Sequence, residues 1–215
     1  IDNPGGLLLQ KKPPFQKWPA VHKDGIAEKG LSQPRMDGAG TIPFPFAEEL
    51  PSALPERIQK GKPYPIDTLF LYYTNPLFSL PEPEKFRIAL QKIPFIVSFS
   101  PFMDETTMLS DLVFPDGTYL ERWQDDHAEP GLGFPMVGLR SPAIDKPLYD
   151  TRNTGDVIIN IAKGIGGNVG KSFPWKDFQE AIKDSIKGVF ASKRGSIQAK
   201  DFEEFWNTLI ERGGW

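Results

Sequence analysis

The chain has 215 residues, of which 39% are hydrophobic and 25% are charged, and its formal net charge is −3. This length is enough to bury a substantial core, and the composition is typical of a globular domain. An acidic balance without a clustered basic face argues against nucleic-acid binding. The sequence has no cysteine, which excludes a disulfide, a thiolate zinc site and an iron–sulfur cluster of its own. It has no run of about 18 apolar residues either, so we expect no direct membrane insertion.

Residues 1–65 are dense in proline and glycine, as in "NPGG", "KKPPF" and "GKPYP". These residues disfavour regular elements, so we expect an irregular arm with at most one helical turn, at Glu48–Leu50 or Glu56–Gln59. A disordered linker usually lacks aromatic residues, whereas this arm holds Phe15, Trp18, Phe44 and Phe46. We therefore predict an ordered arm that packs on a neighbouring surface. The start at "IDNPGG" and the end at "ERGGW" indicate a piece of a longer chain.

From residue 66 the pattern alternates between strands and helices. The runs "IDTLFLYYT" (66–74), "PFIVSFS" (94–100) and "DLVFP" (111–115) are typical of strands, and the first reads as buried on both faces. Helices are predicted between them, at 82–92 and around 104–110. This order predicts a βαβαβ unit with parallel strands. The expected fold class is α/β, a Rossmann-like three-layer parallel sheet that lacks the glycine-rich dinucleotide fingerprint.

The last part of the chain is predicted to be helical. The glycines 164, 166, 167 and 170 lie at or beyond the end of the helix predicted in "TGDVIINIAKGIGG" (154–167), so they indicate a helix C-cap and not a phosphate loop. Two more helices are expected at 175–188 and 199–213, each with an acidic first turn and a glycine at its end. The predicted domains are an arm (1–65), a Rossmann-like domain (66–167) and a helical tail (168–215) that leads toward a following domain.

Ligands of a parallel sheet bind outside the carboxyl ends of its strands. The residues that follow the three predicted strands are Thr74–Pro76, Phe99–Phe102 and Pro115–Arg122. They suit hydrogen bonding to a polar heterocycle or a phosphate. They include no nucleophile with a base, so no catalytic residue is predicted. For "TNP" a plain turn remains an equal interpretation.

Two other groups of polar residues have an ordinary interpretation. His22 and His127 are the only histidines, and we expect both on the solvated surface, one in the arm and one in a loop. An acidic group could bind a cation, but a solvated loop is the simpler interpretation. This acidic group consists of Glu121, Asp125, Asp126 and Glu129.

The stretch from "LFLYYTNPLF" to "SDLVFPDGTYLERW" resembles the third domain of the molybdopterin oxidoreductases of the dimethyl sulfoxide reductase family. In that family a strand ends in an Asn-Pro turn, and the next strand ends in a loop with Thr or Glu-Thr. The motif "ADVVLP" is then followed by a Glu with Lys or Arg after it. "IDNPGGLLLQKK" and "TGDVIINIAKGIGG" resemble two further passages of the family, so the match covers residues 1–8 and 66–167. "TYLERW" and "PMVGLRSPAI" resemble the polysulfide, thiosulfate and tetrathionate reductase branch, and equally subunits of quinone-linked membrane complexes.

The resemblance implies that strand-end loops help hold one guanine dinucleotide of a bis(molybdopterin guanine dinucleotide) cofactor that carries molybdenum or tungsten. It places Asn75 near the guanosine, Phe99 and Ser100 in the second-strand loop, Arg122 after the third strand, and Asp156 against guanine N–H groups. Many relatives have Ser-Asp where this chain has Phe99-Ser100, which puts the second-strand contact in question. A salt bridge to Asp116 or Asp125 is the alternative for Arg122. A helix N-cap is the alternative for Asp156.

The resemblance implies a fragment of a sulfur-compound reductase, inactive alone and without bound cofactor or metal. Its expected partners are other domains of the parent chain, an iron–sulfur electron-transfer subunit and a membrane quinone-linked subunit. Exported relatives make an extracytoplasmic parent plausible. One alternative is a cofactor-free structural subunit of a quinone-linked redox complex. Another is a stand-alone interaction module.

Overall fold

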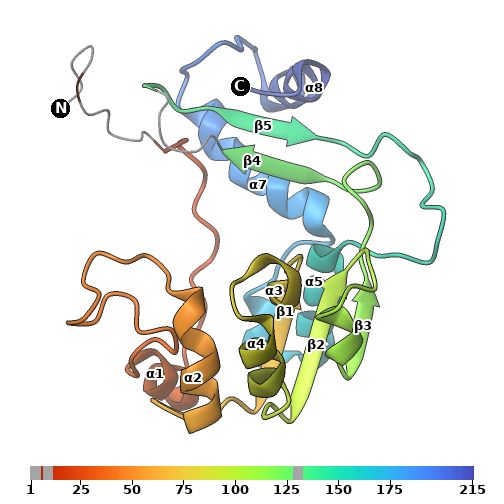
Figure 1. Ribbon diagram of the computed structural model, residues 1–215. Coiled ribbons are helices and arrows are strands. Elements are labelled where there is room, and N and C mark those ends of the chain that lie inside the picture. The colour runs from red at the N-terminus through yellow and green to blue at the C-terminus, as the bar shows by residue number, and fades with distance from the viewer. Residues whose placement is uncertain (1–5, 7–11, 128–132) are drawn as a thin grey trace. The chain divides into compact units, whose positions relative to one another are not determined.

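The computed structural model describes residue 6, residues 12–127 and residues 133–215 (Figure 1). Contacts divide the chain into two compact units. We call them the sheet unit, with Lys23–Asp116 and Asp150–Arg152, and the helical unit, with residues 12–22, Gly117–Tyr149 and Asn153–Trp215. Within the described residues, no helix is both long and apolar enough to cross a membrane.

The sheet unit contains a three-stranded parallel sheet in the order β1-β2-β3. Its strands are β1 (Thr68–Tyr72), β2 (Phe95–Ser100) and β3 (Leu112–Pro115). Tyr72 pairs with Phe99 and Ser100 with Pro115, so all three strands end at the same edge. This arrangement confirms the predicted α/β class with a parallel sheet.

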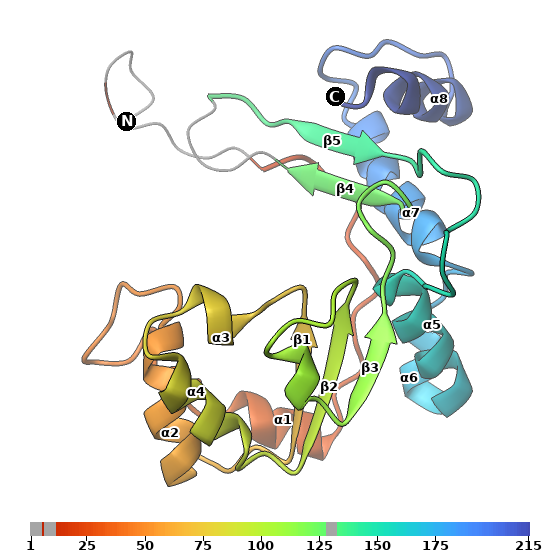
Figure 2. The same cartoon turned by 45° about the vertical axis from the view of Figure 1, so that its right-hand side comes forward.

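Helices of the same unit cover one face of this sheet (Figure 2). They are α3 (Pro76–Ser79), α4 (Pro83–Leu90) and α2 (Leu54–Lys60), together with the short 3-10 helix η2 (Thr107–Leu109). Alternate strand residues point to this face, because side chains of a strand alternate between its two sides. The buried core of the layer consists of Leu71, Leu77, Phe86, Leu90, Ile93 and Ile96.

The prediction that the first strand is buried on both faces is wrong. In β1 only Leu71 is buried, while Phe70 and Tyr72 are 66% and 53% exposed. The reason is topological: β1 is an edge strand, whereas β2 lies between two neighbours and is buried at five of its six residues. A continuous apolar run does not distinguish an edge strand from a central one.

The arm is more regular than the sequence indicated. Helix α1 (Gly25–Leu31) was not predicted; its N-cap Asp24 accepts hydrogen bonds from the N–H groups of Ile26 and Ala27. The turn expected at 56–59 lies inside α2, which begins after the 3-10 helix η1 (Pro51–Ala53). The alternative turn at 48–50 is not helical.

The helical unit contains α5 (Thr154–Ile165), α6 (Gly167–Lys171), α7 (Phe178–Ala191) and α8 (Phe202–Arg212). Gly166 is the C-cap of α5 with a φ of 71°, which confirms the capping interpretation, but it also precedes α6, in which Gly167 and Gly170 lie. Helix α8 ends at Gly213 as predicted. Helix α7 does not end at the expected Gly188 but continues to Ala191.

A close backbone crossing explains Gly188. A Cβ at this position would lie 2.2 Å from the backbone nitrogen of Gln16, so only glycine lets the arm pass over α7. Gln16 N–H donates to the carbonyl of Ser185 over 2.8 Å, and the Trp18 indole donates to the Ser185 hydroxyl over 2.5 Å. This part of the arm therefore packs on a neighbouring helix, as predicted, whereas Phe44 and Phe46 farther along the arm are exposed.

The helical unit also contains an antiparallel pair, β4 (Gln124–His127) and β5 (Val137–Arg140), in a region predicted to be a loop (Figure 1). His127 therefore lies in a strand and pairs with Val137. The chain end lies along the other edge of β5, since Trp215 exchanges two backbone hydrogen bonds with Val137. Val137 and Leu139 pack with α7 and α8 in a core that sequence periodicity of 124–140 did not indicate.

Candidate functional site

The carboxyl edge of the sheet gathers the loops that the sequence analysis singled out. Residues 73–77 follow β1, residues 101–106 follow β2, and Asp116 follows β3. All three segments belong to the sheet unit. Because the strands are parallel, their ends meet at one edge, which is where ligands of such sheets bind.

Asn75 ties the first of these loops to the second. Its Nδ2 donates to Glu105 Oε2 over 2.7 Å, and its Oδ1 accepts from the Thr106 hydroxyl over 2.6 Å. Its backbone carbonyl also accepts from the N–H groups of Phe78 and Ser79, so the residue begins α3. The hydrogen bond from Asn75 is the main cause of a lowered pKa of Glu105. "TNP" is thus both a turn and the anchor of a polar network.

Tyr73 stands at the junction of β1 and this loop in an unusual conformation. Its φ is 50°, in the left-handed region that non-glycine residues rarely adopt. Its N–H donates to the carbonyl of Phe99 over 3.1 Å, which extends the pairing of β1 and β2 by one residue. Strained backbone of this kind concentrates at functional sites. Sequence reasoning did not single out Tyr73.

Phe99 and Ser100 contact parts of the sheet unit itself. The ring of Phe99 lies between those of Phe70 and Phe114, with centroids 6.2 Å and 5.2 Å away, and the residue is 4% exposed. The Ser100 hydroxyl both donates to the carbonyl of Phe102 and accepts from its N–H. The Phe99 side chain is therefore a core group, and Ser100 shapes the loop after β2.

From Gly117 to Tyr149, the chain after β3 belongs to the helical unit. Glu121 Oε2 accepts from both the N–H and the hydroxyl of Thr118, at 2.7 Å and 2.9 Å, and the bond from the Thr118 N–H is the main cause of its lowered pKa. The neighbouring Arg122 is buried, at 9% exposure. Burying a guanidinium costs free energy unless it is paired or hydrogen-bonded, so a buried arginine needs specific partners. Both interpretations of Arg122 stay predictions.

Asp156 occupies the first turn of α5 without capping it. The N-cap is Asn153, whose side chain accepts from the Gly155 N–H over 2.7 Å. One oxygen of Asp156 instead accepts from the N–H of Phe178 over 2.7 Å. The helix-cap alternative for Asp156 is therefore wrong. The carboxylate joins the first turns of α5 and α7, and its guanine role stays a prediction.

The residues fit a nucleotide portion of a cofactor in their chemistry. Within the sheet unit the loop ends offer the Asn75 carboxamide, held in one orientation, and the exposed aromatic Phe102. Carboxamides recognise paired donors and acceptors, and aromatic faces stack on bases. Glu105 and Thr106 were not predicted as site residues, although "Glu-Thr" in the resemblance was a signal for them.

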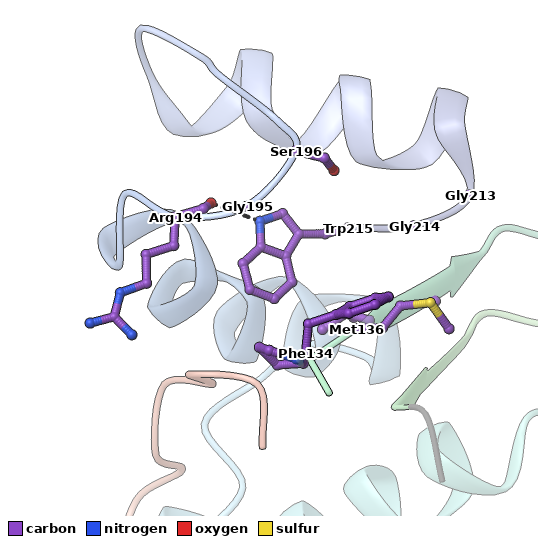
Figure 3. A pocket seen from close by; sticks show the side chains of 11 residues that line it. Phe134, Met136, Arg194, Gly195, Ser196, Gly213, Gly214 and Trp215 are labelled. Atoms are coloured by element: carbon purple, nitrogen blue, oxygen red, sulfur yellow. Dashed lines mark hydrogen bonds between the residues drawn. The ribbon is translucent and has the colours of Figure 1, made fainter. Parts of the chain in front are cut away.

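An apolar cavity of about 620 Å³ lies elsewhere, in the helical unit (Figure 3). Its wall includes Phe134, Met136 and Trp215, and the Trp215 indole donates to the carbonyl of Arg194 over 2.9 Å. None of the five residues named by the resemblance lines this cavity. The lining of the cavity therefore shares no residue with the five that the resemblance names.

Metal ligands do not gather in the part of the chain that the structure describes. No group of three or more histidine, aspartate or glutamate side chains is placed there to hold an ion. Of the acidic group from the sequence analysis, Glu129 lies outside the described residues. His22 is exposed, and its Nδ1 lies 3.4 Å from Asn168 Nδ2.

A solved structure shares the fold of this chain. The structure is similar to acetylene hydratase from Pelobacter acetylenicus, with a TM-score of 0.59 and 22% identity, over 77% of this chain and 20% of that chain. At this identity the likeness establishes the fold, an α/β domain of the kind found in that enzyme. No family model matches the sequence.

Curated relatives match part or all of the chain. The chain is 35% identical over 126 residues to a menaquinone reductase, molybdopterin-binding-like subunit, of Nitratidesulfovibrio vulgaris, covering 59% of this chain and 18% of the relative. It is 28% identical over its whole length to the arsenate respiratory reductase molybdopterin-containing subunit of Shewanella sp. (strain ANA-3), covering 28% of it. A thiosulfate reductase molybdopterin-containing subunit of Salmonella typhimurium is 25% identical over 70% of this chain and 19% of the relative.

Two of these relatives are named molybdopterin-containing subunits of reductases and one a molybdopterin-binding-like subunit of a reductase, which confirms the resemblance drawn from the sequence. They include a reductase of a sulfur compound, thiosulfate. The chain spans less than a third of the length of each of them.

Proposed function

We propose that this chain is the part of a molybdopterin-dependent oxidoreductase that helps hold one guanine dinucleotide of a bis(molybdopterin guanine dinucleotide) cofactor. The observation that supports this most is the Asn75 network at the carboxyl edge of the parallel sheet. It presents a fixed carboxamide where sheets of this type bind nucleotides. The relatives named molybdopterin-containing subunits support the same class of cofactor.

The proposed parent enzyme is a sulfur-compound reductase. When bound, the cofactor with its molybdenum or tungsten supplies the redox chemistry. The residues of this chain bind and orient the nucleotide end, with Asn75 at the guanosine, Ser100 shaping the second loop, and Arg122 and Asp156 as further contacts. The proposed partners are the remaining domains of the parent, an iron–sulfur electron-transfer subunit and a membrane quinone-linked subunit.

Guanine-nucleotide binding by the chain tests this proposal. Guanosine monophosphate (GMP) is titrated into the ¹⁵N-labelled chain, with cytidine monophosphate as the control nucleotide. We expect saturable shifts of the backbone amides of residues 73–78 and 102–106 with GMP, weakened in Asn75→Ala and small with the control. Equal responses to both nucleotides, or shifts confined to other parts of the chain, would contradict the guanosine role.

A second candidate function is a structural domain that has lost the cofactor. Two observations favour it: one relative is named molybdopterin-binding-like, and Phe99 packs in the core at a position where the resemblance leads us to expect a polar residue. In this function the chain contributes packing to a quinone-linked redox complex. Metal and pterin analysis of the purified full-length parent distinguishes the two, since the structural domain predicts neither.

A further inference from the structure

Thr106 lies at the centre of a hydrogen-bond chain that joins the loop after β1 to the loop after β2. The residue is fully buried, and its Oγ1 lies 3.2 Å from the backbone nitrogen of Leu77 and 2.6 Å from Asn75 Oδ1. Its own backbone N–H donates to Asp104 Oδ1 over 3.1 Å, which fixes the second loop. Two side-chain bonds to the first loop and one backbone bond within the second hold the two loops in one arrangement.

The direction of each bond follows from the chemistry of the groups. The Leu77 N–H can only donate, so Thr106 Oγ1 accepts there and its single proton points to Asn75. The carboxamide oxygen of Asn75 therefore faces Thr106, and its nitrogen faces Glu105. A flipped carboxamide would place its oxygen against the Glu105 carboxylate, two acceptors with no proton between them. Only one orientation of Asn75 satisfies all partners.

We propose that Thr106 is a positioning residue: its hydroxyl, together with the Glu105 carboxylate, sets the orientation of the Asn75 carboxamide and thereby the hydrogen-bonding edge that Asn75 presents to a ligand. A carboxamide has two donor protons and an oxygen that accepts twice. After the bonds to Thr106 and Glu105, one donor and one acceptor position remain. Such a pair matches a donor-and-acceptor edge, as guanine has at N1–H and O6. The ligand identity rests on the proposed function, whereas the orientation of Asn75 does not.

The adjacent threonine provides a matched control. Thr107 is equally buried, at 1% exposure, and its Oγ1 lies 3.1 Å from the Ser98 hydroxyl. Replacing either threonine by valine removes one buried hydroxyl of the same kind from the same loop. A general effect on folding therefore affects both variants, while an effect on Asn75 belongs to Thr106.

The readout is the pair of side-chain amide proton resonances of Asn75 in the ¹⁵N-labelled chain, assigned by their loss in Asn75→Asp. We expect Thr106→Val to move them toward the positions of a free asparagine. Thr106→Ser and Thr107→Val should keep the wild-type positions. Unchanged Asn75 resonances in Thr106→Val, or an equal shift in Thr107→Val, would overturn the proposal.

Glu105→Ala gives a second route should Thr106→Val not fold, because Glu105 is on the surface. It removes the acceptor of Asn75 Nδ2, so the same resonances should move; their persistence would overturn the proposal. In the GMP titration, Thr106→Val should weaken binding about threefold to tenfold, as expected for the loss of one hydrogen bond. A wild-type chain that does not bind GMP would count against the proposed function, while the Asn75 resonances still decide the positioning role.

Discussion

The carboxylate of Asp156 accepts a 2.7 Å hydrogen bond from the backbone N–H of Phe178, and this bond joins the first turns of α5 and α7. The same two turns touch at Gly155, where a Cβ would lie 2.4 Å from the Phe178 side chain. Both contacts depend on residues that sequence inspection assigned to a helix start or to a ligand. Their shared role is to fix how two helices of the helical unit begin.

Asp156→Ala should lower the free energy of unfolding by about 1.5–3 kcal/mol, the range for a hydrogen bond to a charged group. Asp156→Asn keeps an oxygen that can accept from Phe178, so its loss should stay below about 1 kcal/mol. Urea denaturation followed by circular dichroism measures both. A loss in the asparagine variant as large as in the alanine variant would show that the charge, and not the bond to Phe178, matters.

The guanine role of Asp156 makes a separate prediction in the full-length parent. Asp156→Asn exchanges an acceptor-only group for one that also donates, and each charge-assisted bond to a guanine N–H is worth about 1.5–3 kcal/mol. We expect lower cofactor content per protein with nearly unchanged thermal stability. An unchanged cofactor content would contradict the guanine role of Asp156 and favour the cofactor-free structural domain.

Gly195→Ala should destabilise the chain by at least about 1–3 kcal/mol. Gly195 has a φ of 86°, and a Cβ there would lie 2.1 Å from the indole nitrogen of Trp215. Gly164→Ala is the control: nothing lies within 4 Å of its Cβ position near the end of α5, and alanine should stabilise that helix by up to about 1 kcal/mol. Thermal unfolding of both variants tests the pair, and a silent Gly195→Ala would contradict the packing described.

Asp37 should make the chain sensitive to acid. Burial raises the pKa of Asp37, but bonds from the Ala39 and Leu50 N–H groups and from Arg35 outweigh it, so the pKa lies below its usual value of 3.8. A lowered pKa in the folded state contributes stability above pH 3.8, and this contribution is lost as the pH falls through the folded value.

As the pH is lowered from 4, the urea midpoint should therefore fall more steeply in the wild type than in Asp37→Asn. At pH 7 this variant should lose about 1.5–3 kcal/mol, because its neutral amide replaces a carboxylate in several hydrogen bonds. Parallel pH profiles of the two proteins would show that another group dominates the acid transition.

Phe99→Ala should cost about 3–5 kcal/mol, as for other buried phenylalanines, because its ring packs against Phe114 and Phe70. Phe99→Leu keeps most of the volume and should cost less than about 1.5 kcal/mol. Phe102→Ala, at a side chain that is 68% exposed, should change stability by less than about 0.5 kcal/mol. Chemical denaturation measures the free energy of unfolding of all three variants. A small loss in Phe99→Ala would contradict the core role of this side chain and favour a ligand role.

The elements that sequence predicted well carry their own local signals. The N-caps of helices α7 and α8 are Asp177 and Asp201, whose carboxylates accept from the N–H groups of Glu180 and Glu204. The three parallel strands followed from β-branched and aromatic runs between helical segments. Such capping and periodicity depend on neighbours within a few residues, which a sequence displays directly.

The candidate site was only partly predictable. The position of Asn75 at a strand end was visible, because parallel strands place their ends at one edge. Its partners Glu105 and Thr106 lie about 30 residues away, and no local pattern indicates which hydroxyl meets which carboxamide. The same holds for the antiparallel pair of β4 and β5: β4 has a polar sequence that resembles a loop, and Val137 and Leu139 of β5 pack against α7 and α8.

The sequence by itself determined the α/β class, the parallel strands, the capped helices and the resemblance to molybdopterin oxidoreductases. All of these depend on local patterns and motifs. Tertiary structure alone decided that β1 is an edge strand, that Gly188 serves a backbone crossing, and that Asp156 binds Phe178. The physical reason is distance along the chain. A glycine, a carboxylate or an apolar run permits several environments, and the segment that packs against it selects one.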